Sequence, residues 1–244
     1  MKRLAAPVVI LLVAVSLLSC ITSASVAEEY YALGSAYLEL KKYPEAESWF
    51  NKSKFHKSTK TASIYNLGRI AYETGRYKEA ASCFEQIIKS DNENISALKA
   101  AAYTHIKLED LEKASLYYGI ILRLVPESHD DGYNYALVLM AMGKAEEAEA
   151  ILVKYNNTEN PDALLVLARS LRQQGRAEAA DAYSASLLKR EDAAIRAEYA
   201  SYLAENGMAE KALEEYRNAL ETGKFSAEKK EEIEKAMEVL EADI

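Results

Sequence analysis

The residues best suited to catalysis or metal binding are few in this chain and stand apart from one another. The three histidines, His56, His105 and His129, are isolated and belong to no recognisable catalytic or metal-ligand motif. His105 falls where helices are expected to pack, so we predict a hydrogen-bonded interior histidine. Glutamate runs are typical of solvated helix faces, and no phosphate-binding loop is present. We therefore predict no enzyme activity, no metal site and no cofactor.

The two cysteines also argue against a metal or disulfide framework. Cys20 and Cys83 are the only cysteines, and they lie too far apart in sequence for a zinc-type motif. Cys83 precedes Phe84 in a helical pattern and is predicted to be a small, buried, apolar residue. Cys20 ends an apolar segment, which gives it a different role.

Composition favours helices and disfavours nucleic acid as a partner. Half of the 244 residues are hydrophobic, while only 4 are proline and 9 are glycine. Alanine, glutamate, leucine and lysine, all good helix formers, are abundant. The formal net charge is −8, and an acidic chain repels a phosphate backbone. The sequence predicts an all-α protein that does not bind nucleic acid.

The first residues read as a leader peptide. Lys2 and Arg3 precede an apolar run at residues 8–18, which is too short to span a bilayer comfortably. The run ends in Ser19-Cys20, which resembles the lipobox of bacterial lipoproteins. The resemblance implies cleavage before Cys20, lipidation of Cys20 and a lipid anchor in the membrane. We expect a signal peptide at 1–19 and a short linker at 20–26.

Other fates of the leader remain open. Ordinary cleavage after Ala27 would give a soluble periplasmic protein, and an uncleaved leader would act as an anchor. Ile21 follows Cys20 where an aspartate would signal retention in the inner membrane. The expected location is therefore the outer membrane of a bacterial cell envelope, facing the periplasm.

The chain from residue 27 to residue 225 repeats one pattern six times. Each copy has two helical patterns around a break, and the copies start 34 residues apart at first and 32 apart later. The predicted units are 27–60, 61–94, 95–128, 129–160, 161–192 and 193–225.

Small residues recur where the two helices of a unit should come closest. The eighth position holds only glycine or alanine, because a larger side chain would push the helices apart. The twentieth position holds Ala46, Ala80, Ala114, Ala148, Ala180 and Ala212. The twenty-fourth position holds Phe50, Phe84, Tyr118, Leu152 and Tyr216, with Ser184 the exception. The left-handed turn that ends a first helix is predicted at position fifteen, at Gly75, Gly143, Gly175 and Gly207.

These positions resemble the tetratricopeptide repeat (TPR) family. The closest matches to its consensus are Leu33, Gly34, Tyr37, Ala46 and Phe50, and then Leu67, Gly68, Ala80 and Phe84. Gly132 and Arg196 depart from it, because the family usually has an aromatic residue there. The resemblance implies an α-solenoid of tandem TPR helix hairpins, a right-handed superhelix with an inner groove.

One further helical pattern follows the repeats. Its apolar residues, Ile233, Ala236, Met237 and Leu240, form one narrow stripe, and most of its other residues are glutamate and lysine. The open end of a repeat array needs an element with a polar outer face. Residues 226–244 are therefore predicted to form a C-terminal capping helix.

The resemblance also implies which side chains line the inner groove. In this family they come from fixed positions of each first helix. Carried onto this sequence they are Tyr65, Asn66, Arg69, Tyr72, Lys99, Tyr103, Lys107, Tyr133, Asn134, Arg169 and Arg172. Tyrosine offers stacking area, asparagine can pair with a peptide backbone, and lysine or arginine can meet a carboxylate.

Alternatives to a partner-binding groove stay open. Acidic groove residues such as Glu198 and Glu205 can neutralise the basic ones internally. A partner can instead dock on an edge or on the outer face, and self-association or a bound apolar ligand are further alternatives.

The leading functional hypothesis is a non-enzymatic scaffold or adaptor, anchored in the envelope, that binds segments of other envelope proteins. Its architecture is similar to repeat lipoproteins that serve outer-membrane protein insertion or pilus assembly. The alternative is an accessory component of an envelope transport system that holds a small apolar or anionic ligand.

Overall fold

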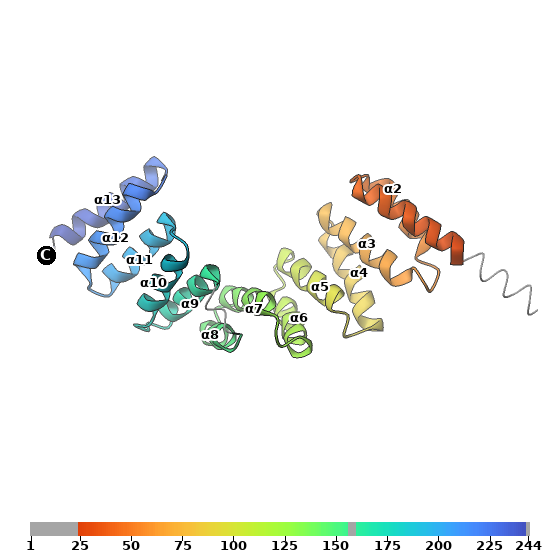
Figure 1. Cartoon of the computed structure of the whole chain (residues 1–244), viewed down its shortest axis with the longest axis horizontal. Coiled ribbons are helices and arrows are strands. Elements are labelled where there is room, and N and C mark those ends of the chain that lie inside the picture. Colours follow the sequence, from red (N-terminus) through yellow and green to blue (C-terminus); the bar gives the residue numbers. More distant parts are fainter. Residues whose placement is uncertain (1–23, 156–159, 243–244) are drawn as a thin grey trace, which may run out of the picture. The chain divides into compact units, whose positions relative to one another are not determined.

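The protein is all-α, as predicted. The computed structural model describes residues 24–155 and 160–242, and every regular element in those ranges is a helix (Figure 1). The chain divides into two compact units, one ending at Leu124 and the other beginning at Val125. None of the helices in the described ranges is both long enough and apolar enough to cross a membrane.

Each unit is a series of antiparallel helix pairs. The N-terminal unit contains a helix at residues 24–39, α2 (Tyr43–Ser53), α3 (Lys60–Glu73), α4 (Tyr77–Ser90), α5 (Ile95–Lys107) and α6 (Leu111–Leu124). The C-terminal unit contains α7 (His129–Ala141), α8 (Ala145–Lys154), α9 (Pro161–Gln173), α10 (Ala179–Lys189), α11 (Ala193–Glu205), α12 (Ala209–Thr222) and α13 (Ala227–Ala242). Figure 1 shows α3 beside α4 and α11 beside α12, as in the other pairs.

A left-handed residue ends the first helix of every pair. The predicted glycines take this conformation, with φ of 76° at Gly75 and 68° to 74° at Gly143, Gly175 and Gly207. Lys41 and Glu109 stand at the same place in the first and third pairs, with φ of 56° and 59°. The turn geometry is therefore common to all six pairs, although two of them lack glycine, the residue that adopts a positive φ most easily.

The two glycines at the eighth position are required by close packing. A Cβ atom on Gly34 would lie 2.8 Å from the ring of Phe50, and one on Gly68 would lie 2.7 Å from the ring of Phe84. Both phenylalanines are buried. The predicted pairing of a small residue with a bulky one is confirmed at these two positions.

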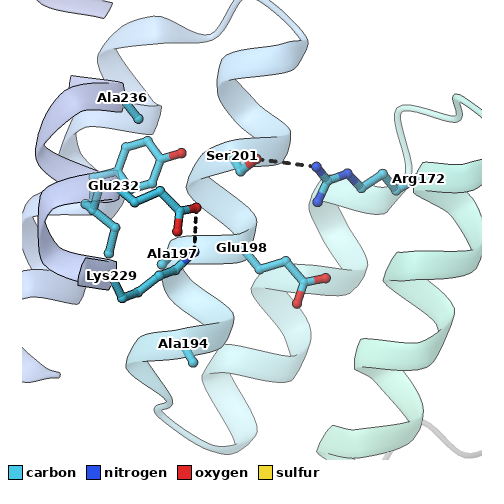
Figure 2. Close-up of a pocket in the computed structure, with 10 residues that line it drawn as sticks. Arg172, Ala194, Ala197, Glu198, Ser201, Lys229, Glu232 and Ala236 are labelled. Atoms are coloured by element: carbon cyan, nitrogen blue, oxygen red, sulfur yellow. Dashed lines mark hydrogen bonds and ion pairs between the residues drawn. The ribbon is translucent and has the colours of Figure 1, made fainter. Parts of the chain in front are cut away.

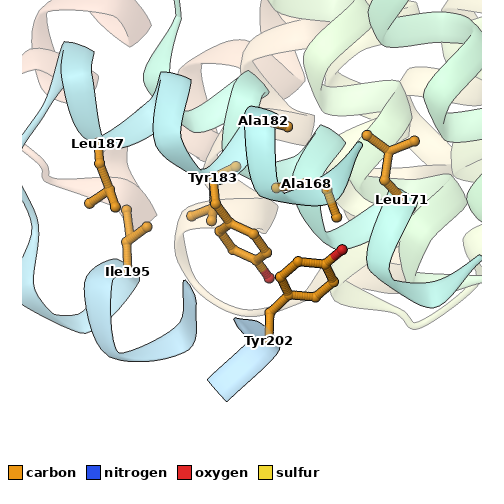
Figure 3. Packing of buried hydrophobic residues seen from close by; sticks show 9 residues of the cluster. Ala168, Leu171, Ala182, Tyr183, Leu187, Ile195 and Tyr202 are labelled. Atoms are coloured by element: carbon orange, nitrogen blue, oxygen red, sulfur yellow. The ribbon is translucent and has the colours of Figure 1, made fainter. Parts of the chain in front are cut away.

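The alignment of the fifth pair is wrong by one residue in its second helix. Ala179 and Tyr183 are fully buried, whereas the predicted Ala180 is half-buried and Ser184 is exposed. Tyr183 packs with Ala168, Leu187 and Ile195 in the core of the C-terminal unit (Figure 3). The register differs because α10 begins at Ala179, after a turn at residues 177–178.

His105 is an interior histidine hydrogen-bonded to a carboxylate, as predicted. Its side chain is 3% exposed, and its Nε2 lies 3.0 Å from Oε1 of Glu85. The same carboxylate accepts a hydrogen bond from Lys113 Nζ at 3.0 Å. Burial by itself would raise the pKa of Glu85, but the hydrogen bonds from Lys113 and His105 lower it overall. The cluster joins α4, α5 and α6.

Cys83 is half-buried and packs beside Ile64 and Ile87. Burial raises the pKa of its thiol, which keeps the sulfur protonated and unreactive at neutral pH. The side chain therefore acts as a small packing residue, as expected, although it is less deeply buried than predicted.

The two departures from the consensus have compensating neighbours. Beside Gly132 the space is filled by Tyr155, whose side chain would lie 3.0 Å from an added Cβ atom. Arg196 donates to Glu215 across 2.6 Å and makes a second ion pair with Glu191. At both positions, a contact from another part of the chain takes the place of the aromatic residue that the family usually has there.

One ion pair recurs between successive helix pairs. Arg76 follows Gly75 and binds Glu47, the residue after the buried Ala46. Arg176 follows Gly175 and binds Glu149, the residue after the buried Ala148, at 2.6 Å. The two bridges occupy the same positions of the repeated pattern, so each links one hairpin to the next in the same way.

The last helix packs on the sixth pair. Ile233 of α13 is 2% exposed and joins a cluster with Ala197, Ala200 and Tyr216. Ala236, Met237 and Leu240 lie partly buried against the same cluster. These are the four residues of the predicted stripe, so α13 covers the end of the C-terminal unit.

Candidate functional site

Five of the predicted groove residues line one pocket of the N-terminal unit. Its volume is about 450 Å³, and its walls come mainly from α3 and α5. The lining residues are Tyr65, Arg69, Tyr72, Phe84, Ser96, Lys99, Ala100 and Tyr103. We call it the tyrosine pocket.

Helical spacing brings these side chains to one place. Tyr65, Arg69 and Tyr72 follow one another by four and three residues, so they share one face of α3. Lys99 and Tyr103 are four residues apart and share one face of α5 in the same way. The two helices lie in contact, and their faces meet at the tyrosine pocket.

Neighbouring rings hold the tyrosines in position. Tyr65 lies 5.5 Å from Phe84, Tyr72 lies 5.4 Å from Tyr77 and Tyr103 lies 6.2 Å from Tyr118, measured between ring centroids. Tyr103 is nevertheless 43% exposed. Burial raises the pKa of Tyr72, with further increases from Tyr77 and Glu73, so its phenol stays protonated at neutral pH. The pocket thus combines apolar ring surface with hydroxyl groups that can donate hydrogen bonds.

The tyrosine pocket has a positive charge balance. Arg69 and Lys99 line it, and none of the described residues that line it is acidic. Arg69 donates one hydrogen bond to the side-chain oxygen of Asn66 at 3.3 Å, and its guanidinium carries further N–H donors. A carboxylate combined with an apolar or aromatic group matches this lining.

Arg69 also lines a second, neighbouring pocket of about 470 Å³. There Lys41 and Arg69 are balanced by Glu39 and Glu73. Asn66 lies between the two helix pairs, only 7% exposed, and donates to the hydroxyl of Tyr31 at 3.2 Å. Its amide therefore has internal partners on both sides, Tyr31 at the nitrogen and Arg69 at the oxygen.

The two predicted arginines of the C-terminal unit have acidic partners of their own. Arg169 donates two hydrogen bonds to Glu198, at 2.9 and 2.7 Å, and Arg172 donates to Glu205 at 3.2 Å. Tyr183 also donates to Glu198, at 2.8 Å. These are the internal ion pairs that the sequence left as an alternative, and they join α9 to α11.

The remaining predicted residues are not brought together at the tyrosine pocket. Tyr133 packs against the cluster around Ala136 and Leu139, and burial raises the pKa of its phenol, with Asp162 adding to the effect. Asn134 is half-buried on the same helix, and Lys107 is exposed at the end of α5. Cys20, the predicted lipidation site, lies outside the described residues.

Figure 2 shows a pocket of the C-terminal unit that sequence reasoning missed. It measures about 480 Å³ and lies between α11 and the last helix. Its floor is made by the small residues Ala194, Ala197 and Ser201, which recur every three or four positions along α11. Its charges are balanced, with Arg172 and Lys229 beside Glu198 and Glu232. Finding it requires knowing where α13 docks, which the periodicity of α11 does not reveal.

Comparison with known proteins identifies related chains and related structures. Over 128 residues the chain is 25% identical to an uncharacterized lipoprotein of Treponema pallidum (strain Nichols), covering 52% of this chain and 65% of that protein. Over 102 residues it is 28% identical to the human protein O-mannosyl-transferase TMTC2, covering 41% of this chain and 12% of that protein. The chain therefore spans less than two thirds of either relative.

Among solved structures, MamA has a TM-score of 0.62 at 17% identity, covering 69% of this chain and 93% of its own. YrrB, described as a TPR protein with an unusual peptide-binding site, has a TM-score of 0.61 at 17% identity, covering 68% and 87%. At this identity the likeness concerns the fold alone. Tetratricopeptide repeat models match residues 27–54, 62–94 and 133–187. With these matches on its helix hairpins, the chain belongs to the tetratricopeptide repeat family.

Proposed function

We propose that the N-terminal unit binds a segment of a partner protein in the tyrosine pocket. The observation that carries this proposal is the lining, in which Arg69 and Lys99 stand among three tyrosines and Phe84 without an acidic residue in the described wall. Two basic residues predicted for the groove elsewhere, Arg169 and Arg172, form ion pairs with Glu198 and Glu205.

Binding would rest on two kinds of contact. A carboxylate of the segment pairs with Arg69 and Lys99, and an apolar side chain packs against Tyr65, Tyr72 and Tyr103. No bond is made or broken, so the protein acts as a non-enzymatic scaffold. The peptide-binding site named for YrrB supports this kind of ligand for a related fold.

The proposal places the scaffold in a bacterial envelope, held by lipid on Cys20. Its support is the leader sequence and the similarity to the lipoprotein of Treponema pallidum. Partners are then other envelope proteins, and outer-membrane protein or pilus assembly are the processes to examine first.

Charge reversal tests the pocket. The double variant Arg69→Glu with Lys99→Glu should lose most recovery of partner proteins after crosslinking in intact cells, because it repels the carboxylate. The matched control is Lys78→Glu with Lys89→Glu, which makes the same change of charge at exposed positions of α4. Circular dichroism melting establishes that both variants fold.

Two outcomes would contradict the proposal. Unchanged partner recovery by the folded pocket variant would move the binding surface elsewhere. A small molecule retained by the purified protein, seen by native mass spectrometry and lost in the same variant, would favour the transport alternative.

A further inference from the structure

The end of the first hairpin where the described chain begins carries exposed aromatic and apolar side chains. Phe55, in the turn after α2, is 83% exposed, and Val26, near the start of the helix at 24–39, is 41% exposed. Tyr30 and Trp49 are half-buried and lie 5.5 Å apart between ring centroids. Together with Lys52, we call these residues the hairpin-end surface.

The register of the hairpin brings these residues to one end of it. The short turn at residues 40–42 folds α2 back antiparallel along the helix at 24–39, where Tyr30 meets Trp49 and Tyr31 meets Phe50 at 5.6 Å. That register sets Val26 opposite the C-terminal end of α2, next to the turn that holds Phe55. This is also the end from which the chain leads back toward Cys20.

Lysines accompany the aromatic rings. Lys52 Nζ lies 4.0 Å from the ring of Trp49 and 5.6 Å from that of Tyr30, and Lys54 Nζ lies 5.5 Å from that of Phe55. The hairpin at residues 24–60 contains six lysines and five glutamates, a formal charge of +1 in a chain of −8, and all six lysines lie in residues 41–60. One of those glutamates, Glu47, is bound to Arg76. Aromatic rings beside lysine stems are the side chains that favour the interface of a membrane with water.

We propose that the hairpin-end surface rests on a phospholipid surface with anionic headgroups. The proposal builds on the envelope anchoring above, because Cys20 stands only four residues before Ala24. Four residues reach at most about 14 Å, so acyl chains on Cys20 would hold this end of the hairpin at the headgroups. Tethering at that distance gives a high effective concentration, and the basic charge complements anionic lipid.

Trp49 is the only tryptophan of the chain and reports on this surface directly. The full-length protein, purified from cells with its native modification, is mixed with an excess of phosphatidylethanolamine and phosphatidylglycerol vesicles containing brominated acyl chains. We expect the Trp49 emission to move to shorter wavelength and to be quenched. In the matched control, Trp49→Phe with Val239→Trp, the reporter sits on the exposed face of α13 and should stay unquenched.

The charge contribution is tested separately. Lys52→Glu with Lys54→Glu should lower the affinity for vesicles, read from a quenching titration, by a factor of roughly five or more for each lysine and remove its dependence on salt. Lys78→Glu with Lys89→Glu makes the same change of charge on α4 and should quench like the wild-type protein.

Several results would overturn the proposal. If Trp49 is not quenched in excess anionic vesicles, with or without acylation, the hairpin-end surface does not dock on lipid. A shift of Trp49 emission that depends on protein concentration without vesicles assigns the surface to a second copy of the chain. Mass spectrometry of the N-terminal peptide measures acylation independently. Quenching of a protein that carries no acyl chain would support lipid docking by the hairpin-end surface and contradict the proposed lipid anchor.

Discussion

At the scale of single residues, the turn that ends each first helix is the most regular feature of the molecule. Six residues adopt a positive φ at the same place of the pattern, and four are glycines. Lys41 and Glu109 adopt it with a side chain, which costs about 1–2 kcal/mol relative to a right-handed conformation. The repeat geometry holds them there.

Replacing Lys41 with glycine should therefore stabilise the protein. We expect about 1 kcal/mol in the free energy of unfolding, because the relief of the left-handed strain exceeds the added flexibility of the unfolded chain. Urea unfolding followed by circular dichroism measures it. Gly75→Ala is the converse control, with a φ of 76° and open space around the missing Cβ, and it should destabilise by a similar amount. A neutral Lys41→Gly would show that the turn is not strained.

At the scale of helices, α9 and α11 are joined through Glu198. Burial by itself would raise the pKa of this carboxyl, but hydrogen bonds from Arg169 and Tyr183 lower it overall, below the ordinary 4.5. The folded pKa is thus lower than the unfolded one. The stabilisation is complete above the ordinary value and is lost as the pH falls through the folded value.

Glu198→Gln should consequently reduce the dependence of the free energy of unfolding on pH in the acid range. At pH 7 the variant should lose about 1 kcal/mol, since the pair is partly exposed. As the pH falls from 7 to below the ordinary value of 4.5, wild type and variant should converge. Unfolding midpoints in urea across this range provide the comparison, and parallel curves would reject the ion pair as the cause.

Helix α13 is the other element whose removal has a defined result. A stop after Gly223 removes Ile233 from the cluster with Ala197, Ala200 and Tyr216. Exposing this cluster should lower the melting temperature and cause aggregation, which light scattering detects, because the end of a repeat array must be covered. Val239→Ser changes a side chain of α13 that is 63% exposed and should have little effect. A truncated protein that stays soluble and equally stable would refute the capping role.

At the scale of the whole molecule, the sequence predicts most of the scaffold because local spacing determines it. Helix periodicity, the glycine turns and the stripe of α13 each depend on residues close in the chain. The register of α10 was not predictable in this way. Ala179 occupies the buried position expected for Ala180 because the turn before α10 sets where the helix begins. The candidate site was predicted in part. Tyr65, Arg69, Tyr72, Lys99 and Tyr103 meet, whereas the partners of Asn66 and Arg169 come from one repeat away and no local pattern specifies them.

The recurring bridge between hairpins has a consequence for how such a chain can be rearranged. Arg76 forms an ion pair with Glu47 of the preceding hairpin. The residue at the equivalent place in the third pair is Asp110, which lies 3.2 Å from His105 instead. Excising residues 61–94 would therefore set Glu47 against an aspartate. The hairpins are alike in shape yet not interchangeable, because their facing charges encode the order in which they follow one another.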